Sequence, residues 1–74
     1  PPDDNLFLAL IAKLFADRQI FPKPEVLQYI TRHSERSFST ASHLVDFLDK
    51  AALSEGKKIS LKFTASNLCK FNDL

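Results

Sequence analysis

The spacing of the apolar residues constrains this chain more than any other feature. From Asp4 onward they recur three and four residues apart, which places them on one face of an α-helix. The residues concerned are Leu6, Phe7, Leu10, Ile11, Leu14 and Phe15. Asp3 or Asp4 can cap this helix by accepting an unpaired backbone N–H. Pro22 and Pro24 lack backbone donors and favour extended geometry in the residues before them, so we expect the first helix to stop near Gln19.

Two further helices are expected before Gly56. Pro24 suits the first turn of a helix that runs to about Arg32, with inward residues Val26, Leu27 and Ile30. Ser34 or Ser37 can cap a longer third helix. Its apolar stripe comprises Phe38, Ala41, Val45, Leu48 and Ala52, and its polar side comprises Ser39, His43, Asp46 and Lys50. Gly56, the sole glycine, can take the left-handed conformation that commonly ends a helix.

The last stretch fits two patterns. Ile59, Leu61 and Phe63 alternate with polar residues as in a strand, whereas Leu61, Ala65 and Leu68 have helical spacing. A lone strand would leave its backbone groups unpaired, so we expect a fourth helix from near Ser60 to Phe71. The sequence therefore predicts an all-α fold, a small four-helix bundle in one domain that spans residues 1–74.

The composition points to a cytoplasmic protein without a membrane partner. No apolar run has the length that spans a bilayer, and the only cysteine, Cys69, cannot form an internal disulfide. We expect Cys69 to be a small buried apolar side chain. Ten Lys and Arg against nine Asp and Glu give a net charge of +1, and the basic residues are scattered from Lys13 to Lys70. Charge alone therefore does not call for nucleic acid.

No set of residues predicts independent catalysis or a metal site. Lys57 and Lys58 follow a glycine, but a phosphate-binding loop needs a second glycine and a Ser or Thr after the lysine. His33 and His43 do not have the spacing of zinc ligands. Asp46 and Asp49 have the spacing of a solvated helix face. We therefore expect that this segment is not an enzyme by itself.

A helix-turn-helix is the alternative that the second and third helices raise. The turn between them holds Arg36, and Arg32 precedes it. A recognition helix presents basic and amide side chains to DNA, whereas Asp46 and Asp49 on the third helix would repel the phosphates. We expect no direct DNA binding from this segment, and a stand-alone DNA-binding module stays the alternative.

The order of these elements resembles the C-terminal helical lid of the DnaA/Hda-type AAA+ replication proteins over nearly the whole chain. The residues that carry the likeness are Pro1-Pro2-Asp3-Asp4 before the first helix, Pro24-Glu25-Val26 with Ile30 in the second, and the turn Gly56-Lys57-Lys58-Ile59-Ser60 before the closing helix. The chain ends soon after that helix, which favours the Hda-like branch over DnaA, whose DNA-binding domain follows the lid. A clamp-loader subunit lid has the same architecture and is a second alternative.

The resemblance implies a segment of a longer protein that regulates the initiation of chromosome replication. The lid would close over ATP or ADP with Mg²⁺, held mainly by an AAA+ core outside this sequence. The partners implied are that core, DnaA and the sliding clamp.

The resemblance also identifies candidate nucleotide-binding residues. In the family, an arginine near the start of the third lid helix senses phosphate, because a guanidinium makes two charge-assisted bonds to phosphate oxygens. Ser39 occupies that position here, and its hydroxyl is uncharged and short. Arg36 lies three residues earlier and is the candidate to replace the sensor, with Arg32 as a less favoured one. The predicted nucleotide-binding residues are therefore Arg36 and Ser39.

Overall fold

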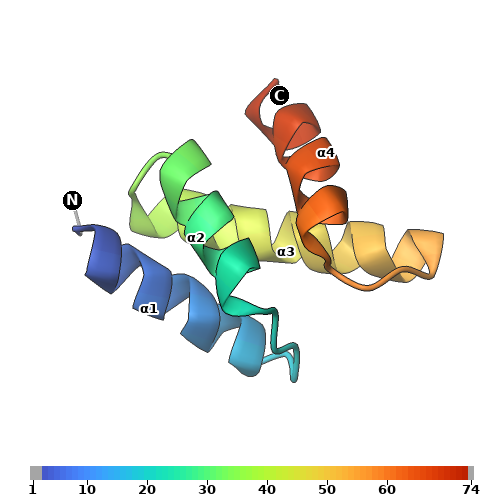
Figure 1. Ribbon diagram of the computed structural model, residues 1–74, viewed down its shortest axis with the longest axis horizontal. Coiled ribbons are helices and arrows are strands. Elements are labelled where there is room, and N and C mark those ends of the chain that lie inside the picture. The colour runs from blue at the N-terminus through green and yellow to red at the C-terminus, as the bar shows by residue number, and fades with distance from the viewer. Residues whose placement is uncertain (1–2, 74) are drawn as a thin grey trace.

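The computed structural model describes residues 3–73, and within that range every regular element is an α-helix. The helices are α1 (Asp4–Ala16), α2 (Pro24–His33), α3 (Phe38–Glu55) and α4 (Leu61–Asn72) (Figure 1). The all-α prediction and the four predicted segments are thus confirmed. The Pro1-Pro2 part of the family-like opening lies outside the described residues.

Three of the four helices begin at a side chain that caps the backbone. Asp3 accepts a hydrogen bond from the Leu6 N–H over 2.8 Å, Ser37 accepts one from Thr40, and Ser60 accepts one from Phe63. Each cap satisfies a first-turn donor that the helix itself leaves unpaired. α2 lacks such a bond and instead has Pro24 in its first turn. The structure thus selects Asp3 and Ser37 from the predicted alternatives.

The first helix ends three residues before the predicted limit of Gln19. Gln19 has a φ of 60°, and the Ile20 N–H donates to the Phe15 carbonyl over 2.9 Å. Helices often end in this way, with a left-handed residue followed by a backbone hydrogen bond that spans five residues. Glycine usually fills such a position, so the prolines were the only stop signal that could be read in this segment. The left-handed turn ends α1 before the prolines are reached.

The four helices pack in a closed ring, with α1 and α4 each against both α2 and α3 (Figure 1). Within the described residues, their buried faces meet in one apolar core. Its members are Phe7, Ile11, Phe15, Val26, Leu27, Ile30, Ala41, Leu44, Val45, Leu48, Ala52, Phe63 and Leu68. The helical spacing predicted most of these positions, including all three inward residues of α2. The ring leaves the N-terminal ends of α1 and α3 close enough for their side chains to meet.

Several positions differ from the predicted core. Leu6 is 63% exposed next to the fully buried Phe7, so it lies off the buried face of α1, and Phe38, the first residue of α3, is 70% exposed. α4 buries Phe63, Thr64, Asn67 and Leu68, whereas Leu61 is exposed. The face of α4 is therefore rotated from the one that Leu61, Ala65 and Leu68 predicted. Cys69, on the outer side, is exposed, so its predicted burial is wrong.

Within residues 3–73, no helix combines the length and apolar character needed to cross a membrane. No group of three or more His, Cys, Asp or Glu side chains in that range could hold a metal ion. The His33 ring instead stacks on Tyr29, with centroids 4.2 Å apart, and His43 lies on the exposed side of α3.

Candidate functional site

The predicted nucleotide-binding residues lie on either side of the Ser37 cap at the start of α3. Ser37 accepts from the Thr40 N–H over 3.1 Å, and its hydroxyl donates to the Thr40 hydroxyl over 2.8 Å. These bonds fix the first turn, so the backbone at Ser39 is held in helical geometry. No acidic side chain occupies that turn. The positive end of the helix dipole is therefore not neutralised from within the turn.

Arg36 forms an ion pair with Asp4, in the first turn of α1. The contact joins the starts of two helices that are far apart in the sequence. Nε of Arg36 makes no aligned hydrogen bond, so the attraction is that of two close charges. The Arg36 side chain is 32% exposed and that of Asp4 is 72% exposed. Ion pairs this open to water contribute at most about 1 kcal/mol, so the guanidinium can exchange Asp4 for another anion.

Ser39 is exposed, and within the described residues no hydrogen bond or ion pair joins it to Arg36. The structure therefore brings the two candidates to one end of α3 without linking them directly. Neither lines the surface depression of about 460 Å³ that lies between α3 and α4. Its lining residues are Glu35, Thr40, His43, Phe71 and Asn72. The two candidates stand on an open surface, which by itself does not enclose a ligand.

Two large apolar side chains are exposed in the first turns of the two helices whose starts the ion pair joins. Leu6 of α1 is 63% exposed and Phe38 of α3 is 70% exposed. Single exposed apolar residues are common, and Phe21 and Leu53 are more exposed still, so these two do not by themselves define an interface.

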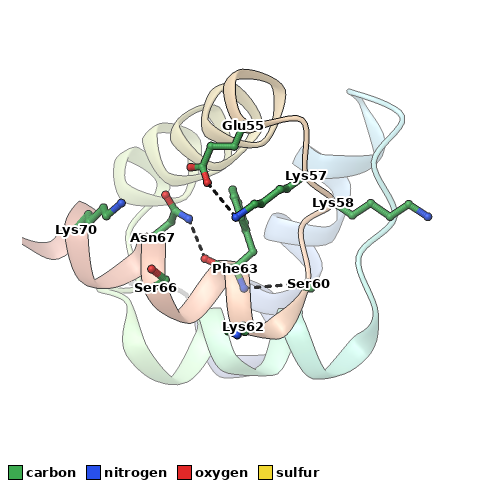
Figure 2. Close-up of a pocket in the computed structure, with 9 residues that line it drawn as sticks. All are labelled: Glu55, Lys57, Lys58, Ser60, Lys62, Phe63, Ser66, Asn67 and Lys70. Atoms are coloured by element: carbon green, nitrogen blue, oxygen red, sulfur yellow. Dashed lines mark hydrogen bonds and ion pairs between the residues drawn. The ribbon is translucent and has the colours of Figure 1, made fainter.

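A second polar surface, which the sequence did not predict, lies between the end of α3 and α4. A groove of about 420 Å³ is lined there by Glu55, Lys57, Lys58, Ser60, Lys62, Phe63, Ser66, Asn67 and Lys70 (Figure 2). The four lysines span fourteen positions of sequence, and for this reason they do not form a block in it. The spacing of Lys62, Ser66 and Lys70 by four residues is the signal that could have grouped them once α4 was expected.

No protein-family model, curated protein or solved structure gives a significant match to this chain.

Proposed function

We propose that this chain is the lid subdomain of a DnaA/Hda-like AAA+ protein. In this role it covers ATP or ADP bound with Mg²⁺ by an AAA+ core, and couples the state of the nucleotide to the regulation of chromosome replication. The observation that carries the proposal is the place of Arg36, partly exposed, immediately before the capped and acid-free first turn of α3. A phosphate is favoured at such a helix start, and a guanidinium beside it adds charge-assisted hydrogen bonds.

In this proposal the core docks at the starts of α1 and α3. It would cover the exposed side chains of Leu6 and Phe38, and the Arg36 guanidinium would lie at the seam between the two domains. The resident Asp4 would hold Arg36 while phosphate is absent. Because Asp4 is 72% exposed and Arg36 is partly exposed, phosphate oxygens would displace Asp4 at a modest cost in free energy.

Ser39 contributes less in this proposal. Its hydroxyl can donate one neutral hydrogen bond, whereas the arginine of the family supplies two charge-assisted ones. The lid would therefore sense phosphate through Arg36 and use Ser39 as an auxiliary donor. DnaA and the sliding clamp are the proposed partners of the complete protein.

The test compares ADP affinity in the polypeptide that joins this chain to its nucleotide-binding core. Arg36→Ala should weaken ADP binding roughly tenfold to a hundredfold, since a hydrogen bond to a charged group contributes about 1.5–3 kcal/mol. Arg32→Ala, which removes an exposed arginine late in α2, is the matched control and should leave the affinity unchanged. Ser39→Arg restores the residue type of the family and should tighten binding. Equal affinities for wild type and Arg36→Ala would remove Arg36 from the nucleotide site.

A further inference from the structure

The lysine groove, defined as the surface formed by Lys57, Lys58, Lys62 and Lys70 with Ser66 and Asn67, concentrates positive charge on one side of the molecule. Its lining contains four lysines and a single carboxylate, Glu55. The rest of the chain holds six Lys and Arg and eight Asp and Glu. The groove is thus net positive while the remainder is net negative, although the whole chain is almost neutral. A field of this kind attracts polyanions to one face.

Three of the four lysines are free to meet an external anion. Lys57 lies 3.7 Å from Glu55, but Lys58, Lys62 and Lys70 form no ion pair with any carboxylate of residues 3–73. Elsewhere, Lys13, Arg18 and Lys50 are all paired with aspartates. In Figure 2 the side chains of Lys58 and Lys70 lie at opposite ends of the groove. They therefore suit an extended anion better than a single small ion.

Side-chain hydrogen bonds support the helix that carries two of the lysines. Ser60 caps α4, and the buried Asn67 amide donates to the Phe63 carbonyl over 3.0 Å, within the same helix (Figure 2). Lys62, Ser66 and Lys70 recur every four residues on α4, so the two lysines are about 12 Å apart along its axis. The first turn of α4 holds no acidic residue. An approaching polyanion thus meets two lysines whose backbone positions are set by one helix, with Lys57 and Lys58 in the turn before it.

We propose that the lysine groove binds the phosphate backbone of a duplex nucleic acid without reading its sequence. Protein interfaces are depleted in lysine and enriched in Arg, Tyr and Trp, none of which lines this groove. Its one aromatic residue, Phe63, is only 7% exposed and cannot stack on an unpaired base, which disfavours a single strand. Lysine ammonium groups are point charges that match phosphates at any sequence.

This proposal revises the expectation of no DNA contact, which rested on the acidic outer side of α3. The groove lies at the other end of that helix and on α4. It does not depend on the proposed nucleotide lid, since it shares no residue with Arg36 or Ser39. Loss of nucleotide binding in Arg36→Ala and loss of duplex binding from the groove are separate outcomes.

The experiment titrates the 74-residue chain against fluorescently labelled duplex DNA of mixed sequence, duplex RNA and single-stranded DNA, and measures anisotropy. Three neutralised phosphates give a slope of about −2.7 for log affinity against log salt, so affinity for duplex should fall roughly fortyfold between about 50 and about 200 mM salt. Duplexes of unrelated sequence should bind alike. No duplex binding at low salt, or tighter binding of the single strand, would overturn the proposal.

Charge-neutral variants locate the binding surface. Lys58→Gln, Lys62→Gln and Lys70→Gln should each reduce the magnitude of the salt slope by about 0.9, and the triple variant should lose measurable binding. Lys and Gln have similar helix propensities, and circular dichroism would verify the fold. Lys23→Gln removes an exposed lysine outside the groove and should bind as wild type. A loss of duplex binding in Lys23→Gln as large as in the groove variants would overturn the assignment to the groove. Polyglutamate serves as a polyanion without phosphate, and tighter binding of polyglutamate than of duplex would overturn the assignment to nucleic acid.

Discussion

The Arg18 guanidinium donates to the Asp49 carboxylate over 2.9 Å and thereby ties the turn after α1 to the middle of α3. Its other terminal nitrogen lies 3.2 Å from Asp46, which also meets Lys50 at 3.0 Å. The hydrogen bond from Lys50, followed by that from Arg18, holds the pKa of Asp46 below its ordinary value of 3.8. The hydrogen bond to Asp49 in turn raises the pKa of Arg18. The cluster is a long-range contact that the sequence did not predict.

Asp46→Asn should therefore destabilise the protein in a pH-dependent way. A carboxyl group whose pKa is lower in the folded state stabilises above its unfolded pKa, and this contribution is lost as the pH falls through the folded pKa. The difference in unfolding free energy between wild type and Asp46→Asn should be constant near neutral pH and should shrink below about pH 4. Urea titrations at several pH values would measure it. Asp17→Asn, which removes only the exposed pair with Lys13, is the control expected to have a smaller effect. A difference that grows on acidification would contradict this assignment.

Leu48→Ala tests the core at the centre of α3. Leu48 is fully buried, so its truncation removes apolar contacts and leaves a cavity, with an expected loss of about 2–5 kcal/mol. Small domains have few kcal/mol to lose, and the variant should be largely unfolded at moderate urea. Leu53→Ala is the matched control on the same helix, since Leu53 is 76% exposed. Its unfolding free energy should stay within about 0.5 kcal/mol of wild type. Similar losses in both variants would mean that α3 does not face the core as described.

The two left-handed residues within positions 3–73 should respond to substitution in opposite directions. Gly56 has a φ of 64°, and replacing it with Ala should lose about 1–2 kcal/mol from backbone strain, although nothing lies within 4 Å of the added Cβ. Gln19 has a φ of 60° with a side chain already present, so Gln19→Gly should stabilise by up to about 1 kcal/mol. Thermal melts of the two variants would show the contrast. A destabilised Gln19→Gly variant would indicate that the side chain compensates the strain.

The pattern of apolar residues predicted the number, order and approximate limits of the helices, because burial on one face imposes a period close to that of the helix. The pattern did not predict where α1 ends or which residues near the helix starts are buried. A left-handed glutamine has no strong sequence signal, so α1 was predicted too long. Phe38 and Leu6 continue the predicted apolar period, but both side chains are exposed. Periodicity predicts the direction in which a side chain points from its helix. It does not predict whether another helix packs over that side chain.

The candidate sites were likewise predicted in part, because sequence order gives the helix that carries a residue but not the residue's contacts with other helices. Family-like order placed Arg36 and Ser39 at the start of a helix, as observed, but could not reveal the partner Asp4, which lies 32 residues earlier. The lysine groove depends on the packing of α4 against the end of α3, and only the phase of α4 sets which lysines share a face. That phase was predicted from Leu61, which the fold leaves exposed. The spacing along α4 could group Lys62 with Lys70, but only the assembly of the helices brings Lys57 and Lys58 beside them.

The pair of Arg36 with Asp4 gives a prediction that separates competition for the guanidinium from general charge effects. In a polypeptide that joins this chain to the proposed nucleotide-binding core, Asp4→Asn should strengthen ADP binding by up to roughly fivefold, because a partly exposed pair of at most about 1 kcal/mol no longer competes with phosphate. Asp3→Asn removes the same charge one residue earlier and preserves the cap, since Asn and Asp cap equally well. It should leave the affinity nearly unchanged, and in an Arg36→Ala background Asp4→Asn should have no effect. Calorimetric titration with ADP measures the affinity of each variant. Equal gains in ADP affinity for Asp3→Asn and Asp4→Asn would show that the overall charge, and not the Arg36–Asp4 pair, controls ADP binding.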